Sequence, residues 1–68
     1  MSAIPKAQPP AFYVQARWDD HWFTELDEVD RPIRRTLKDA IRLAQLQARF
    51  YPAFFRVIDR NGDVVARY

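Results

Sequence analysis

Residues 58–65 read Ile-Asp-Arg-Asn-Gly-Asp-Val-Val, and this stretch decides the fold. Asn-Gly between β-forming residues is the strongest short-range signal for a β-hairpin. Gly62 is the only glycine in the chain, and it falls where a tight turn requires positive φ. We therefore predict a hairpin with strands over 54–59 and 63–68. A two-residue loop sets the facing pairs, which are Arg60 with Asp63, Ile58 with Val65 and Arg56 with Arg67.

Before this hairpin the apolar residues recur with a helical period, which predicts a helix with its body at 37–49. The stripe expected to face a sheet consists of Leu37, Ala40, Ile41, Ala44 and Ala48. Two starts fit the sequence. The helix begins either at Asp30, with Pro32 in its first turn, or at Thr36, where Thr-Leu-Lys-Asp approximates a capping box. Pro52 forces it to end.

Towards the N-terminus the period changes to two. Apolar and polar residues alternate over 12–18, and a second strand is expected from Trp22 to about Val29. A three-residue loop, 19–21, would place Trp18 opposite Trp22 and both tryptophans on the core face. The same register pairs Ala16 with Thr24 and Val14 with Leu26.

The predicted order is therefore ββαββ, an α+β fold with one helix packed on one face of a four-stranded antiparallel sheet. Residues 12–68 form the single predicted domain. Residues 1–11 contain three prolines and no periodicity, so we expect a flexible, Pro-rich N-terminal arm.

Composition argues against catalysis. The chain of 68 residues has no cysteine, one serine (Ser2) and one histidine (His21), so a positioned nucleophile with its base is not available. The Asp19-Asp20-His21 cluster is interpreted as a turn, and the carboxylates over 25–30 as a solvated strand end. We predict a protein that is not an enzyme and has no catalytic residues, no metal site and no cofactor.

The same composition indicates where the protein works. The absence of cysteine fits a reducing compartment, and no apolar run approaches the roughly 18 residues of a membrane span. We therefore expect a cytoplasmic location without membrane contact. The net charge of +2 is too small to indicate nucleic acid by itself.

One side of the predicted helix is a candidate binding surface. An apolar strip runs beside a row of basic residues, as in the anchor and polar rim of a protein interface. The predicted partner-binding residues are Arg35, Lys38, Arg42, Leu43, Leu46, Arg49 and Phe50. The alternative is that the N-terminal arm or the second hairpin covers the strip.

The open face of the predicted sheet is the alternative surface. Aromatic rings interleaved with arginines can stack on bases and hold phosphates. The predicted residues are Tyr13, Arg17, Phe23, Phe54, Arg56 and Arg67. Burial in a homodimer or under the arm explains the same residues, and nearby carboxylates weaken the case for phosphate binding.

The segment from Thr36 to Ala44, Thr-Leu-Lys-Asp-Ala-Ile-Arg-Leu-Ala, is followed by Tyr-Pro-Ala at 51–53 and Phe-Arg-Val at 55–57. This helix-to-strand segment resembles that of small phage-encoded inhibitors of bacterial RNA polymerase. The resemblance implies a class, compact phage proteins that obstruct a host machine, and with it a location in the cytoplasm of a bacterial host cell. Anti-CRISPR proteins are a second group of similar size in that class.

Three hypotheses for function follow. The first is a non-enzymatic phage or mobile-element protein that binds a host protein complex and inhibits or redirects it. The second is an accessory factor that binds nucleic acid through arginines and aromatic residues. The third is a homodimeric structural protein.

Overall fold

The computed structural model describes residues 10–68, so residues 1–9 of the predicted arm lie outside the described part. Ala11, also assigned to the arm, is buried. Four strands and one helix follow in the predicted ββαββ order. They are β1 (Tyr13–Trp18), β2 (His21–Thr24), α1 (Leu37–Phe50), β3 (Phe55–Ile58) and β4 (Val64–Arg67). The predicted α+β fold is confirmed.

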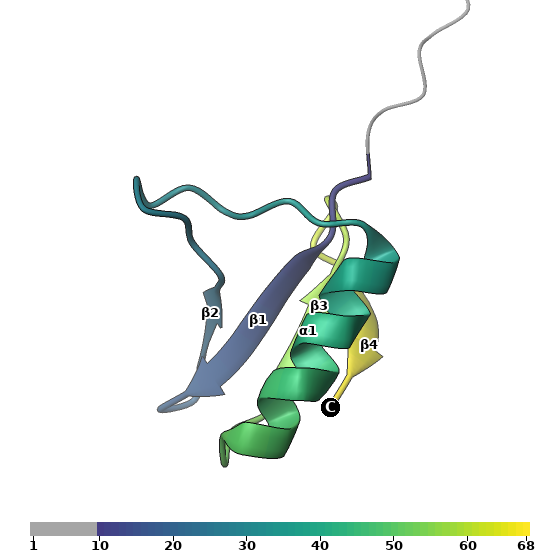
Figure 1. The fold of residues 1–68 in the computed structure, drawn as a ribbon. Helices are drawn as coiled ribbons and strands as arrows, with labels where there is room; N and C mark the ends of the chain where they lie inside the picture. The colour runs from purple at the N-terminus through teal and green to yellow at the C-terminus, as the bar shows by residue number, and fades with distance from the viewer. Residues whose placement is uncertain (1–9) are drawn as a thin grey trace, which may run out of the picture.

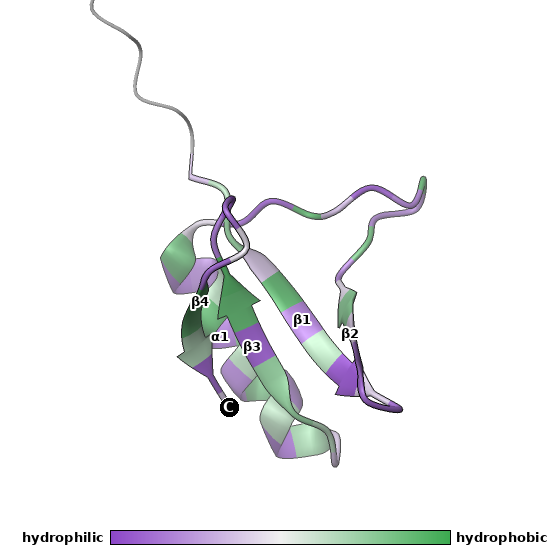
Figure 2. Cartoon of the chain, turned by 180° about the vertical axis from the view of Figure 1, so that it is seen from behind, coloured by the Kyte–Doolittle hydropathy of each residue, from purple (hydrophilic) through white to green (hydrophobic). Residues whose placement is uncertain are grey.

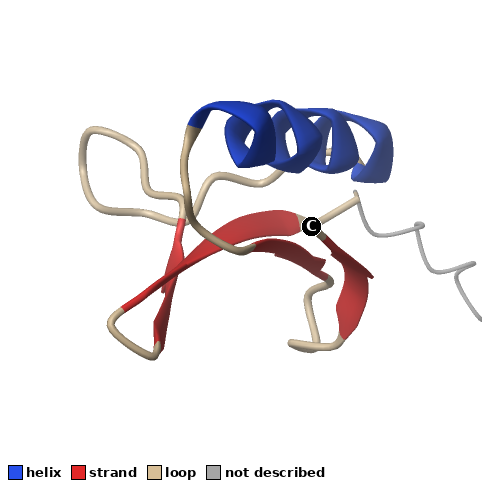
Figure 3. Ribbon diagram, turned by 90° about the horizontal axis from the view of Figure 1, so that it is seen from below, coloured by secondary structure: helices blue, strands red, loops and turns tan. Residues whose placement is uncertain are grey.

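The strands form one antiparallel sheet in the order β2-β1-β3-β4. The helix lies across one face, over β1 and β3, in a two-layer arrangement (Figures 1 and 3). The other face, toward the viewer in Figure 2, has no element packed on it within residues 10–68. The fold therefore leaves one sheet face open and places β2 and β4 at the edges.

The helix begins after Thr36, which settles the two predicted starts. The Thr36 hydroxyl accepts a hydrogen bond from the Asp39 backbone N–H at 3.2 Å, as an N-cap does. At the other end, the N–H of Tyr51 donates to the Gln47 carbonyl at 2.9 Å, and Pro52 prevents a further turn.

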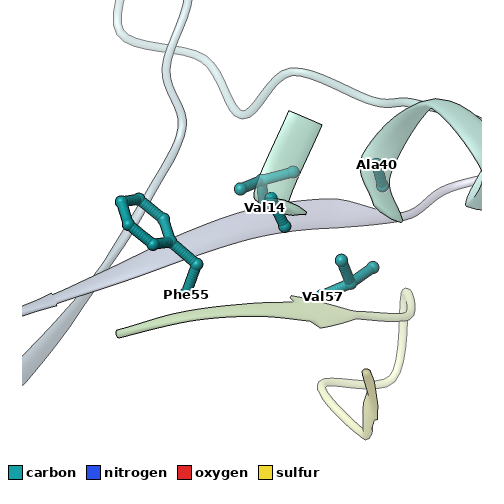
Figure 4. Packing of buried hydrophobic residues seen from close by; sticks show 5 residues of the cluster. Val14, Ala40, Phe55 and Val57 are labelled. Atoms are coloured by element: carbon teal, nitrogen blue, oxygen red, sulfur yellow. The ribbon is translucent and has the colours of Figure 1, made fainter. Parts of the chain in front are cut away.

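The core is small and lies between α1 and the two central strands. Ala40 and Ala44 have no exposed surface, and they lie against Val14, Phe55 and Val57 (Figure 4). Because alanine side chains end at Cβ, the helix backbone approaches the sheet closely. The rest of the predicted stripe is less buried: Ile41 and Ala48 are half-buried and Leu37 is exposed.

The predicted register of the first hairpin is wrong by one residue. The loop contains only Asp19 and Asp20, with φ of 50° and 63°, and Arg17 pairs with Trp22. Two consecutive positive φ values are typical of a type I′ turn, whose twist matches that of the strands, and Asp tolerates this conformation better than most residues.

A one-residue shift moves every side chain of a strand to the other face. Trp22 therefore points to the open face, whereas Phe23, opposite Ala16, points to the helix side. Trp18 stays on the helix side but is exposed rather than in the core. The strand itself ends at Thr24 instead of near Val29.

The second hairpin has the predicted Gly62 at positive φ, 85°, but not the predicted two-residue loop. The Asp59 N–H donates to the Asp63 carbonyl, and the Gly62 N–H to that of Asp59, which closes a three-residue loop. The Asp59 carboxylate accepts two backbone N–H groups, those of Asn61 and Asp63.

The longer loop changes the pairing beyond the turn. Ile58 pairs with Val64 rather than Val65, and a bulge restores the predicted pairing of Arg56 with Arg67.

The segment between β2 and α1, residues 25–36, is held by an ion pair rather than by a longer strand. The Arg35 guanidinium donates two hydrogen bonds to the Glu25 carboxylate, at 2.7 and 2.9 Å. This carboxylate raises the pKa of Arg35 above its ordinary value, through the hydrogen bond first and despite partial burial. Backbone bonds between Phe12 and Arg35 attach the same segment to the entrance of β1.

Candidate binding surfaces

Large apolar side chains are exposed at one end of the domain. The β1–β2 turn and the C-terminal end of α1 lie at the same end in both Figure 1 and Figure 2. We call one group of exposed side chains near that end the helix-side surface. They lie on the helix or on the side of the sheet that faces it. Its members, with their exposed fractions, are Trp18 (67%), Phe23 (56%), Leu46 (49%), Phe50 (73%) and Tyr51 (59%).

The handedness of the helix determines which strands this surface adjoins. With Ala40 and Ala44 turned to the sheet, Leu43 and Phe50 point to one flank of α1, and Ile41 to the other. A right-handed helix that runs as α1 does in Figure 1 directs the flank with Phe50 toward β1 and β2. Phe23 therefore lies on the side of the domain that Phe50 faces.

The sequence-predicted helix residues divide into three groups. Leu46 and Phe50 are exposed, and Leu43 is half-buried against the core. Three basic residues, Lys38, Arg42 and Arg49, are exposed on the helix. The exception is Arg35, which precedes the helix and is paired with Glu25, so it does not belong to the helix face.

The open sheet face carries a second group, arranged in a row across all four strands. Thr24, Gln15, Arg56 and Arg67 are neighbours in register on β2, β1, β3 and β4. Gln15 links three strands: its Nε2 donates to the Thr24 hydroxyl at 2.9 Å, and its Oε1 accepts from Arg56 Nε at 2.7 Å. Gln15 is buried although it lies on the open face, because its neighbours cover it.

Arg56 is also fixed by an aromatic ring. Its guanidinium lies 4.0 Å from the ring centroid of Trp22, a cation–π contact. One hydrogen bond and one ring thus hold the guanidinium in place on the sheet. Arg17, on the same face, pairs instead with the Asp20 carboxylate at 2.8 Å, where both side chains are solvent-exposed.

Arg17, Trp22 and Arg56 line a shallow hollow of about 460 Å³, which we call the open-face hollow. The hollow brings together four of the six predicted sheet-face residues, and its full lining is Arg17, Trp22, Phe54, Phe55, Arg56, Arg67 and Tyr68. The two others lie elsewhere. Tyr13 lines a separate hollow near the β3–β4 loop, and Phe23 is on the helix side.

Sequence reasoning missed the roles of Trp18, Trp22 and Gln15. A three-residue loop predicts the core face for Trp22, whereas Trp18 is predicted there by the alternation over 12–18 and lies on that side but exposed. A signal was present, since two adjacent aspartates suit a two-residue turn that needs positive φ. Nothing in the strand pattern marks Gln15 as a buried bridge.

Residues 10–68 contain no cluster of three or more His, Cys, Asp or Glu side chains able to hold a metal ion. Within the same residues, no helix combines the length and the apolar character needed to cross a membrane. The side chains of the two surfaces offer apolar contact, ring stacking and charge.

Comparison with protein-family models, curated proteins and solved structures found no match.

Proposed function

We propose that this protein is a small non-catalytic binding domain that attaches to another protein through the helix-side surface. The observation that carries the proposal is the exposure of Trp18, Phe23 and Phe50, each more than half exposed, at one end of so small a domain. Isolated apolar side chains on a surface need no explanation, but several at one end mark an interaction site.

The chemistry of the surface favours a protein partner. Tryptophan, tyrosine and arginine are the residues that most often dominate the binding energy of protein interfaces. Here Trp18 and Tyr51 supply aromatic anchors, while Arg42 and Arg49 lie on the same helix as Phe50. An apolar centre with a basic rim fits a partner whose own apolar patch is rimmed by carboxylates.

The charge on the helix argues against a second copy of the chain as the partner. In a twofold dimer the same patch meets itself, so residues of the helix face their own counterparts. The exposed side of α1 carries Lys38, Arg42 and Arg49 against a single carboxylate, Asp39. Such a dimer would bring like charges together, which opposes association.

A bacterial host complex is the proposed partner, which the domain inhibits or redirects. The resemblance of the segment from Thr36 to Val57 to phage-encoded inhibitors of RNA polymerase supports this choice. The absence of cysteine and the presence of only one serine and one histidine support a role in binding rather than in catalysis.

The test is a pair of substitutions, Leu46→Gln with Phe50→Gln, in an affinity pull-down from nuclease-treated bacterial lysate. Glutamine is a good helix former without charge, so α1 should persist. We expect one protein partner with the wild-type chain, and its loss with the double variant. Arg67→Gln, on the opposite face, is the matched control and should retain the partner.

Thermal unfolding of the double variant decides between binding and folding roles. Leu46 is 49% exposed and Phe50 is 73% exposed, so we expect a melting temperature close to that of the wild type. A double variant that unfolds would show that Leu46 and Phe50 belong to the core. A double variant that melts normally and still retains the partner would refute the proposed surface.

A further inference from the structure

The open-face hollow contains a pair of arginines that the described residues leave uncompensated. Arg56 on β3 and Arg67 on β4 are directly opposite each other in register. Like charges in facing positions destabilise a sheet, by some tenths of a kcal/mol. The Arg67 side chain has no hydrogen bond or ion pair within residues 10–68, and none of the side chains that line the hollow is acidic.

One of the two arginines is held in place by specific contacts. The Arg56 guanidinium is fixed by Gln15 at 2.7 Å and by the Trp22 ring at 4.0 Å. Neither contact neutralises its charge. Arg67 faces this fixed charge from the next strand, and an anion bound between the two arginines would remove the repulsion between them.

Aromatic rings adjoin these charges. Phe54 lines the hollow beside Arg17, whose backbone N–H donates to the Phe54 carbonyl at 2.9 Å. The Phe54 side chain is 66% exposed, so most of its surface is available for stacking. The hollow thus offers planar apolar surface and positive charge within one small area.

We infer that the open-face hollow binds single-stranded nucleic acid, with phosphates at Arg56, Arg67 and Arg17 and a base stacked on Phe54. Single-strand binders combine a positive groove with rings on which bases stack. In a duplex the bases are paired and stacked on one another, so a ring on a sheet cannot reach their faces. An acidic peptide would satisfy the arginines but leave the exposed Phe54 ring without a planar partner.

This site is independent of the proposed protein-binding function, because the two surfaces are on opposite sides of the sheet. Two carboxylates of the segment between β2 and α1 do not oppose phosphate binding in the hollow, because other groups engage them. Glu25 is engaged by Arg35, and Asp27 accepts backbone N–H groups of its own loop. Among residues 10–68, Asp20 is the one carboxylate that pairs with an arginine of the hollow, and its partner is Arg17.

Fluorescence anisotropy with a labelled oligothymidine of about twelve nucleotides tests the inference, the length lying within the usual site sizes. Three arginines predict a slope of log affinity against log salt near −2, so affinity should fall about 20-fold between 50 and 200 mM salt. Arg67→Gln should reduce this slope by about 0.7, whereas Arg67→Lys should keep it. Phe54→Ala should weaken binding about tenfold or more at any salt concentration.

The Leu46→Gln, Phe50→Gln double variant is the control, and it should bind the oligonucleotide as the wild type does. Arg67 is exposed, so its variants should remain folded, and thermal unfolding verifies this. The inference is overturned by absent binding at 50 mM salt, or by affinity that Arg67→Gln and Phe54→Ala leave unchanged. Equal or tighter binding of polyglutamate would assign the hollow to acidic peptides, and a preference for duplex would equally refute it.

Discussion

Gln15 is the residue on which the open face depends, and Gln15→Leu tests that dependence. The side chain is buried and joins β2 to β3 through two hydrogen bonds, to Thr24 at 2.9 Å and from Arg56 at 2.7 Å. Leucine has a similar volume but neither a donor nor an acceptor. The substitution therefore removes both bonds without opening a large cavity.

The expected cost follows from the two bonds. A hydrogen bond to a charged group contributes about 1.5–3 kcal/mol and a neutral one about 0.5–1.5 kcal/mol. Leucine recovers part of this through apolar burial, and the half-buried Thr24 and Arg56 can turn to water. We expect a net loss of about 1–2 kcal/mol in the free energy of unfolding, or about 4–16 °C in melting temperature.

Urea unfolding of a double-mutant cycle measures the bridge directly. Thr24→Val is nearly isosteric and should cost about 0.5–1.5 kcal/mol alone, but close to nothing when Gln15 is already leucine. In a Trp18→Phe background, Gln15→Leu should also alter the fluorescence of Trp22, because Arg56 loses the bond that keeps it over the ring. Equal costs of Thr24→Val in both backgrounds, or a Gln15→Leu protein as stable as the wild type, would refute the bridge.

Substitutions at three further positions test the fold by urea unfolding. Val57→Ala removes two buried methyl-sized groups from a fully buried site and should cost about 2–3 kcal/mol, so a cost under 1 kcal/mol would contradict its place in the core. Gly62→Ala meets no atom within 4 Å, so only its φ of 85° opposes it, at about 1–2 kcal/mol, and Gly62→Asn should cost less. Thr36→Ala should cost about 1 kcal/mol as a lost N-cap and Thr36→Ser almost nothing; equal costs would exclude capping.

The elements of this fold could be predicted from the sequence because each has a local cause. The helix follows from a 3.6-residue period, from Thr36 as its cap and from Pro52 as its stop, and none of these depends on distant residues. The Asn61-Gly62 turn is equally local. Such signals locate elements well even when neither the sheet order nor the packing is known.

The strand register could not be predicted with the same success, because one residue more or less in a loop changes which residues of the two strands face each other. The alternation over 12–18 is compatible with a loop of two or three residues after Trp18. The observed two-residue loop directs Trp22 to the open face. The predicted three-residue loop directs it to the core face, so Trp22 is absent from the predicted binding residues. Arg56 was predicted for the open face, but the cation–π contact that fixes it depends on this register.

The strongest argument for a binding role is that small side chains fill the core of this domain while large ones lie on its surface. Its two fully buried helix residues are alanines, and within residues 10–68 the largest fully buried side chain is Val57, with Phe55 5% exposed. Large aromatic rings, including Trp18 and Phe50, are mostly in contact with solvent. Burying a side chain of that size would contribute about 1.5–3 kcal/mol, a large gain for a chain whose core is limited by its length. A sequence selected for stability alone would place such rings inside, so their exposure is better explained by surfaces that complete their burial against a partner.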